Sequence, residues 1–318
     1  MKTRKVNFKT AENETFKNVF IRFFVLWISV SNIHSQTIER PKAQPYNIES
    51  TFEKLKKKHP FIQPLNLDFP KNIKVSKDVE YKNSDGRSLK ADIYYPDNSS
   101  QKYPGIILVH GGGWISGSKE NERFLAQELA SKGYVAMAIN YSLSDDAKYP
   151  TAVQDIEDAL KFLKKHRKEF SLNKNKIAIG GNSAGAQLAT LVGVKNKVQA
   201  IVNIDGIVSF IHPESEEGTY ASYWFGATKS QNFELWKEAS PLEYVGKNTA
   251  PTIFINSSQP RFHGGRDDMI KILEANKIYY EVYEIKDSPH SFWLVQPWFD
   301  ETLDYTVKFL DKILRNKI

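Results

Sequence analysis

Three short segments of the sequence hold residues that could together perform acyl transfer. The first is Gly181-Asn182-Ser183-Ala184-Gly185, which follows the apolar run Lys176–Ile179 and opens a second apolar run at Ala184. A serine with small residues two positions before and after it is typical of a tight strand-to-helix turn that exposes the hydroxyl. That hydroxyl would lie at a helix N-terminus, where the helix dipole favours developing negative charge. Ser183 is therefore the candidate nucleophile.

The second segment is a glycine loop, His110-Gly111-Gly112-Gly113-Trp114, directly after the apolar run Gly105–Val109. Glycines leave backbone N–H groups free to point at a reacting carbonyl oxygen. We expect the amides of Gly112, Gly113 and Ala184 to form an oxyanion hole. A phosphate-binding loop is the alternative, but the serine and lysine of that motif stand here in exchanged order.

The third segment supplies the base. Among the seven histidines, His290 follows the last predicted strand, Tyr279–Ile285, in the loop Ser288–Phe292. A loop after the final strand brings an imidazole to the sheet edge where the serine turn lies. His290 is therefore the candidate general base, with an ordinary surface histidine as the alternative.

The elements that must position these segments alternate between strands and amphipathic helices. The predicted strands are Ile73–Tyr81, Leu89–Tyr95, Gly105–Val109, Tyr134–Ile139, Lys176–Ile179, Val198–Ile204, Pro251–Ile255 and Tyr279–Ile285. The predicted helices are Asn121–Ser131, Thr151–His166, Ala184–Val194, Asp268–Asn276 and Phe299–Ile313. This alternation predicts an α/β fold with a mostly parallel central sheet and helices on both faces. The first two strands lack a helix between them and should form an antiparallel edge.

Residues outside this alternation suggest how the chain is organised. We divide it into a signal peptide (1–35), an N-terminal extension rich in proline (36–72) and one catalytic domain (73–318). Within that domain, residues 206–249 interrupt the alternation, and we expect this insertion to cover the strand ends where ligands bind. The insertion is rich in Trp and Tyr, whose rings stack on sugars; core packing is the alternative.

The N-terminus has the parts of an export signal. A basic, polar region precedes the short apolar run Phe23–Val30, and a small residue, Ser35, precedes Gln36. The run is shorter than the roughly 20 residues that a membrane-spanning helix needs. We expect cleavage near Gln36, a periplasmic or secreted protein, and no stable membrane insertion after cleavage. An uncleaved anchor and an amphipathic surface helix are the alternatives.

Composition excludes several kinds of chemistry. The 318 residues include no cysteine, which excludes disulfides, cysteine-ligated zinc, iron–sulfur clusters and a thiol nucleophile. Six basic against two acidic residues in the first 35 account for +4 of the net charge of +7, which leaves only +3 for the rest. We therefore expect no nucleic-acid partner, although an acidic small ligand fits. Without a zinc-hydrolase motif or a dinucleotide fingerprint, no metal or organic cofactor is implied.

Three motifs, namely the serine turn, the glycine loop and Pro289-His290-Ser291-Phe292, carry a resemblance to a known family. Over about residues 75–315 the chain resembles α/β-hydrolase esterases of the hormone-sensitive-lipase-like and feruloyl-esterase-like branch. The resemblance implies an α/β-hydrolase fold and a serine esterase that forms an acyl-enzyme on Ser183. The stretch Ser257–Asp268 is similar to secreted bacterial carbohydrate esterases that demethylate pectin. That similarity implies esterified plant polysaccharide, above all methyl-esterified pectin, as the substrate. Acetyl-xylan and feruloyl esters are the alternatives.

Substrate contacts are expected from Trp114, Arg261 and Arg266. The two guanidinium groups could grip the carboxylates of unesterified uronates, or they could pair with neighbouring acids. Two rivals from other classes are a prolyl-oligopeptidase-like serine peptidase and a non-catalytic binding protein. The former usually carries a further domain, and the latter usually lacks the serine or the histidine.

The catalytic acid departs from the family pattern. The resemblance places it after the strand Pro251–Ile255, where this chain has Gln259, which carries no charge. Asp205 ends the preceding strand, Val198–Ile204, and vertebrate pancreatic-type lipases offer a precedent for an acid there. Asp267 or Asp268 is the second candidate, and the absence of an acid is the third.

Overall fold

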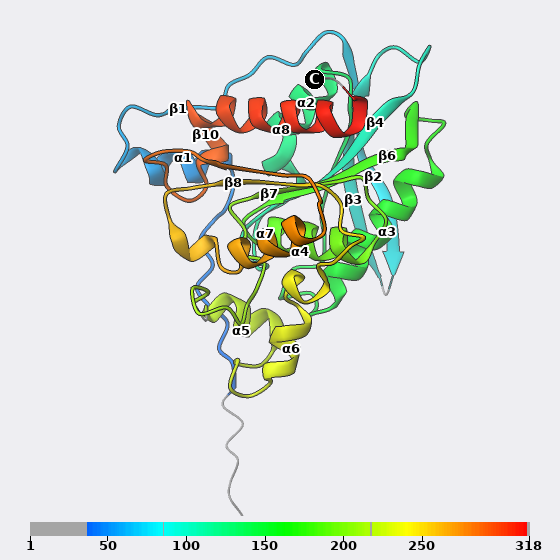
Figure 1. Cartoon of the computed structure of the whole chain (residues 1–318). Helices are drawn as coiled ribbons and strands as arrows, with labels where there is room; N and C mark the ends of the chain where they lie inside the picture. Colours follow the sequence, from blue (N-terminus) through cyan, green and yellow to red (C-terminus); the bar gives the residue numbers. More distant parts are fainter. Residues whose placement is uncertain (1–36, 85, 217, 317–318) are drawn as a thin grey trace, which may run out of the picture. The chain divides into compact units, whose positions relative to one another are not determined.

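An eight-stranded sheet forms the centre of the fold (Figure 1). The computed structural model describes residues 37–84, 86–216 and 218–316. Along the sheet the strand order is β2-β3-β5-β4-β6-β7-β8-β9. Their bounds are β2 (Ile73–Ser84), β3 (Arg87–Pro96), β4 (Tyr103–Val109), β5 (Val135–Ile139), β6 (Leu172–Asn182), β7 (Ala200–Ile204), β8 (Thr252–Asn256) and β9 (Tyr280–Glu284). All eight predicted strands are confirmed.

The pairing of the strands confirms the predicted mixed sheet. β2, β3 and β5 pair antiparallel in turn, so β2 and β3 form the expected antiparallel edge. All later pairs are parallel. The register sets Val109 beside Gly181 and Asn182 beside Ile204. The carboxyl ends of β4, β6 and β7 therefore meet at one edge, which is where the glycine loop and the serine turn begin.

Helices cover both faces of the sheet, as predicted. They are α1 (Ile48–Lys56), α2 (Arg123–Ser131), α3 (Thr151–Lys165), α4 (Ala184–Lys195), α5 (Thr219–Phe225), α6 (Phe233–Glu238), α7 (Arg266–Ala275) and α8 (Trp298–Arg315). Side chains of β4 alternate between two cores: Ile106 packs with α2 and α8, and Ile107 packs with α3 and α4. This alternation explains why β4 is apolar along its whole length, since both of its faces are buried.

The extension before the sheet forms a short capped helix. Asn47 accepts a hydrogen bond from the Ser50 backbone N–H at 2.7 Å, and Ser50 Oγ accepts one from the Asn47 N–H at 3.1 Å, which closes a capping box around α1. Downstream, β1 (Gln63–Pro64) pairs with β10 (Val295–Gln296), shortly after the loop that carries His290. The extension thus packs beside that loop. The predicted signal, residues 1–35, lies outside the described residues. No helix in the described ranges is long and apolar enough to cross a membrane.

The insertion at residues 206–249 contains two short helices, α5 and α6, which the sequence analysis did not predict. Trp224 and Trp236 are fully buried and pack against Phe210 and Phe225. Core packing, the alternative to sugar stacking, therefore holds for these two tryptophans. They hold the insertion on the sheet, and only other parts of the insertion reach the cavity described below.

Candidate active site

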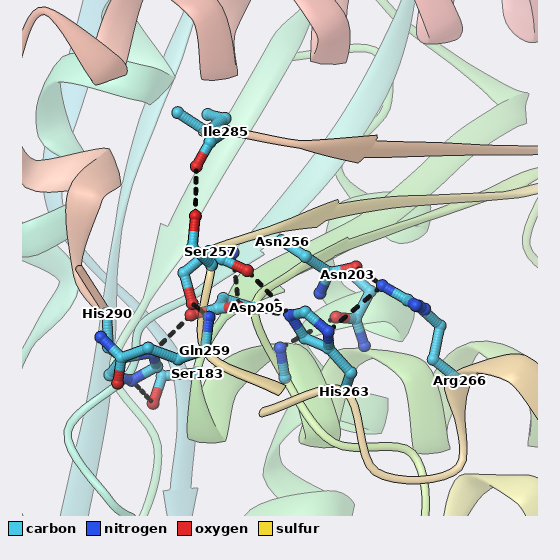
Figure 2. Close-up of polar contacts among 12 residues, drawn as sticks. Ser183, Asn203, Asp205, Asn256, Ser257, Gln259, His263, Arg266, Ile285 and His290 are labelled. Carbon is cyan, nitrogen blue, oxygen red and sulfur yellow. Dashed lines mark hydrogen bonds and ion pairs between the residues drawn. The ribbon is translucent and has the colours of Figure 1, made fainter. Parts of the chain in front are cut away.

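Ser183, His290 and Asp205 form one hydrogen-bonded chain (Figure 2). Ser183 Oγ lies 2.8 Å from His290 Nε2, and His290 Nδ1 lies 2.7 Å from Asp205 Oδ2. The serine follows β6, the aspartate follows β7, and the histidine lies in the loop after β9. An imidazole held in this way can accept the proton of the serine while the carboxylate stabilises the resulting positive charge.

The serine turn is tightly constrained. Ser183 has φ 52° and ψ −124°, a left-handed conformation that non-glycine residues rarely adopt, directly before α4. A Cβ at Gly185 would lie 2.1 Å from the Val109 carbonyl oxygen, and one at Gly181 would lie 2.5 Å from that same oxygen. The end of β4 therefore approaches the turn so closely that only glycine fits at these two positions. This explains the small residues on either side of Ser183.

Asp205 lies in a buried turn that supplies hydrogen-bond donors to its carboxylate. It has φ 53°, in the region that Asp tolerates better than most residues, and its side chain is fully buried. Asp205 Oδ1 accepts a hydrogen bond from the Ser257 backbone N–H at 2.8 Å. Burial alone would raise the pKa of Asp205, but the nearby His263 imidazole and the hydrogen bond with His290 outweigh it and hold that pKa well below its usual range. Asp205 therefore stays ionised beside the imidazole.

A second histidine, which the sequence analysis did not single out, faces the same carboxylate. His263 Nε2 lies 3.0 Å from the Ser257 carbonyl oxygen and 3.7 Å from Asp205 Oδ1. Its Nδ1 lies 3.3 Å from Arg266 Nη1. A guanidinium only donates, so His263 Nδ1 is the acceptor and the ring proton sits on Nε2. Nε2 then donates to the Ser257 carbonyl oxygen, close to Asp205. No pattern in the sequence around His263, three residues before Arg266, indicates that it approaches Asp205.

The other predicted acids lie away from the imidazole. Asp267 pairs with Arg266 at 2.8 Å, and Asp268 pairs with Lys271 at 2.8 Å, both in the first turn of α7. Gln259, at the position usual for the acid, donates its backbone N–H to Ser257 Oγ at 3.3 Å. The structure brings Asp205 to His290 and leaves the alternative acids on the helix.

Aromatic rings fix the orientation of the imidazole. Phe262 stacks on His290 with ring centroids 3.6 Å apart and 10° between the planes, and Trp293 meets the imidazole edge-on at 5.1 Å. The Arg261 guanidinium lies 4.6 Å from the centre of the Phe262 ring. Neither ring contact could be predicted from the sequence, because contact across the loops after β8 and β9 leaves no periodic signal.

Buried hydrogen bonds hold the glycine loop against the serine turn. The Gly111 N–H donates to Asn182 Oδ1 at 2.9 Å, and Asn182 Nδ2 donates to Glu122 Oε1 at 2.6 Å. Glu122 is 1% exposed, and burial raises its pKa from 4.5 to about 7. Gly112 has φ 115° and Gly113 has φ 60°, so the loop needs glycine at both positions. Asn182 therefore couples the loop to the nucleophile turn.

A cavity of about 280 Å³ opens beside Ser183. Its lining residues are Gly113, Trp114, Ser183, Ala184, Gln187, Asp205, Gly206, Ile207, Phe210, Glu216, Gly218, Tyr220, Ala221, Arg261 and Phe262. Gly113 and Ala184 of the expected oxyanion hole border this cavity, whereas Gly112 does not. Trp114 also borders it, and its Nε1 donates to Gln187 Oε1 at 3.1 Å.

The two arginines expected to bind substrate have different places. Arg261 borders the cavity and lies 3.4 Å from Glu216 at its rim. Arg266 does not border it: its guanidinium bonds Asn256 Oδ1 at 2.9 Å and Asp267 Oδ1 at 2.8 Å. The expected substrate contact of Arg266 is thus replaced by a supporting contact with His263. Across the described residues, no cluster of His, Asp and Glu has the arrangement of a metal site.

The chain is similar in sequence to proteins named as esterases. Esterase LipC of Mycobacterium tuberculosis is 25% identical over 200 residues, which cover 56% of this chain and 48% of LipC. The chain therefore spans about half the length of that relative. Probable carboxylesterase 5 of Arabidopsis thaliana is 24% identical over 292 residues, which cover 79% of this chain and 90% of the plant protein.

A solved structure supports the fold. Est2, an esterase of Thermogutta terrifontis, aligns with a TM-score of 0.62 at 22% identity, covering 76% of this chain and 93% of Est2. The BD-FAE family model matches residues 91–281, more than half of the chain, from within β3 to within β9. The predicted α/β-hydrolase fold is confirmed, and the chain belongs to the BD-FAE family of esterase-type α/β-hydrolases.

Proposed function

We propose that the chain is a serine carboxylic-ester hydrolase. The observation that carries this proposal is the hydrogen-bonded chain from Ser183 through His290 to Asp205 beside an open cavity. The family and the named esterases among its relatives support it. A complete, ionised triad also argues against a non-catalytic binding protein, which would have no need to keep Asp205 buried and charged.

The arrangement supports an acyl-enzyme mechanism. His290 Nε2 takes the proton of Ser183 Oγ as this oxygen attacks the ester carbonyl. The backbone N–H groups of Gly113 and Ala184, with that of Gly112 beside them, stabilise the negative oxygen of the tetrahedral intermediate. His290 then gives its proton to the leaving alcohol, and the acyl group stays on Ser183. Water, activated by the same imidazole, releases the carboxylic acid and restores the serine.

For the substrate we propose an esterified plant polysaccharide, above all methyl-esterified pectin, from which methanol would leave. Arg261 supports this choice, because its guanidinium borders the cavity and can bind the carboxylate of an unesterified uronate. We also propose export, with cleavage of residues 1–35. Mass spectrometry of the native protein should then find a mature chain that starts near Gln36, and a retained Phe23–Val30 segment would contradict export with cleavage.

A panel of esters tests the activity and the substrate. Purified mature chain should be assayed on methyl-esterified pectin, acetyl-xylan, methyl ferulate and 4-nitrophenyl acetate. We expect hydrolysis of the nitrophenyl ester and methanol release from pectin, with activity lost in Ser183→Ala and kept in Ser230→Ala, an exposed serine of the insertion. Undiminished turnover by Ser183→Ala would refute the serine esterase. Acetate or ferulate release without methanol would refute only the pectin substrate.

A further inference from the structure

A second cavity is lined by the catalytic His290 but not by Ser183. It measures about 610 Å³ and is bounded by helix α1 with the turn after it, the loop after β8 and the loop after β9. The lining residues are Lys54, Leu55, Lys58, His59, Ser258, Gln259, Arg261, Asp287, Ser288, Pro289, His290 and Ser291. His290 therefore borders this second cavity, whereas Ser183 borders the first.

The lining of the second cavity is predominantly basic. Lys54 and Lys58 are exposed, and neither forms an ion pair with any residue of the described ranges. Arg261 adds a third positive charge, and among the described residues it pairs with Glu216, which borders the first cavity, at 3.4 Å. Of the described carboxylates, Asp287 alone lines the second cavity against these three cations. Such a surface attracts anions.

A buried donor in the wall also lacks a partner. Ser288 is 4% exposed, and its Oγ forms no hydrogen bond within the described structure. A buried hydroxyl without a partner costs free energy, so the wall of this cavity holds an unsatisfied polar group. Arg261 borders both cavities, so the two lie on either side of one side chain. The ligand of the second cavity can therefore be part of the same molecule that reaches Ser183.

We propose that the second cavity is a subsite for carboxylate groups of a polyanionic substrate, bound by Lys54, Lys58 and Arg261. This inference rests on the proposed ester hydrolase and names its substrate class: an ester carried on a chain that also bears free carboxylates. The ester unit occupies the first cavity at Ser183, and the neighbouring acidic units extend past His290 to α1. Ammonium and guanidinium groups both bind carboxylates through charge-assisted hydrogen bonds. The N-terminal extension thereby becomes part of the substrate-binding surface.

A binding experiment tests the subsite without depending on turnover. Unesterified galacturonate oligomers are titrated calorimetrically into Ser183→Ala protein, with and without the added pair Lys54→Ala/Lys58→Ala. Two solvent-facing charge contacts at about 0.7 kcal/mol each predict a loss of affinity of roughly tenfold. Lys57→Ala, on the same lysine run but outside the cavity lining, is the matched control and should bind like its parent. Equal affinity of the double variant and the Lys57→Ala control would overturn the subsite.

Kinetics on two esters separate this inference from the proposed function. In otherwise wild-type protein, Lys54→Ala/Lys58→Ala should raise KM on partly methyl-esterified galacturonate oligomers about tenfold more than KM on neutral 4-nitrophenyl acetate. Equal effects on both esters would refute the subsite and leave the esterase standing. Nitrophenyl ester turnover that survives Ser183→Ala would refute the esterase, and the calorimetric result would still decide whether the cavity binds the polyanion.

Discussion

Asp205→Asn is the substitution whose effect the structure predicts in most detail. The two carboxylate oxygens of Asp205 have different partners: Oδ1 accepts from the Ser257 N–H at 2.8 Å, and Oδ2 faces His290 Nδ1 at 2.7 Å. An asparagine at this position must keep its carbonyl oxygen on the Ser257 N–H, because a backbone N–H can only donate. The amide group of the asparagine then points its own N–H at His290 Nδ1.

This reversal puts the imidazole in the wrong tautomer. With Nδ1 accepting, the ring proton of His290 moves to Nε2, which then donates to Ser183 Oγ at 2.8 Å and cannot take its proton. We expect kcat to fall by 10³- to 10⁴-fold, about 4–5.5 kcal/mol of transition-state stabilisation. Folding should change little, since the side chain keeps its volume and its bond to Ser257.

The assay is steady-state hydrolysis of 4-nitrophenyl acetate, with circular dichroism to confirm folding. Asp267→Asn is the matched control, because Asp267 is paired with Arg266 and does not contact His290. We expect this control to stay within a few-fold of the wild-type rate. A rate within tenfold of wild type for Asp205→Asn, or an equal loss in Asp267→Asn, would refute the assignment of Asp205 as the acid.

Three further substitutions test the surroundings of the site. Gly185→Ala should lower the free energy of unfolding by about 3 kcal/mol in denaturant titrations, because its Cβ would lie 2.1 Å from a backbone oxygen, whereas Gly246→Ala meets nothing within 4 Å and should be neutral. Glu122→Gln should remove a pH dependence of the free energy of unfolding. Burial raises the pKa of Glu122 in the folded protein from 4.5 to about 7. The folded protein is therefore stabilised by the protonated carboxyl fully below pH 4.5, and this stabilisation is lost as the pH rises through 7. The variant should match wild type near pH 4.5 and exceed it by on the order of 2–3 kcal/mol at pH 8, and a constant difference across this range would contradict that reasoning. Arg266→Ala should lower kcat on neutral and anionic esters alike, because it removes the contact that orients the His263 imidazole beside Asp205. A KM effect confined to the anionic ester would instead show that Arg266 binds substrate.

The fold, Ser183 and His290 could be predicted from the sequence because they depend on local pattern, whereas Asp205 could be named only as the first of several candidate acids. The continuous apolar run of β4 requires burial on both faces, so it marks a parallel strand directly. The turn at Ser183 requires glycines for a steric reason that the motif itself displays. Helices α5 and α6 escaped prediction because they are only seven and six residues long, too short for a clear periodic pattern.

The acid and the substrate contacts depended on distant contacts and were harder to predict. Asp205 directly follows β7 and Asp267 lies in the first turn of α7, and the contact that makes Asp205 the acid joins it to His290, 85 residues later in the chain. Arg261 lies between β8 and α7, and Arg266 opens α7 five residues later, yet the first borders the cavities and the second supports His263. The basic cavity joins α1 with loops more than 200 residues later in the chain, a pairing that no local pattern reveals.

Covalent labelling with a nitrophenyl phosphonate most directly tests whether Ser183 is the nucleophile. The phosphonate should release nitrophenol once per chain, and peptide mass spectrometry should place the adduct on Ser183. Labelling should disappear in Ser183→Ala and slow by orders of magnitude in Asp205→Asn, because the same imidazole activates the serine toward phosphorus. An adduct on another residue, or full ester hydrolysis by protein whose Ser183 is completely blocked, would contradict the mechanism.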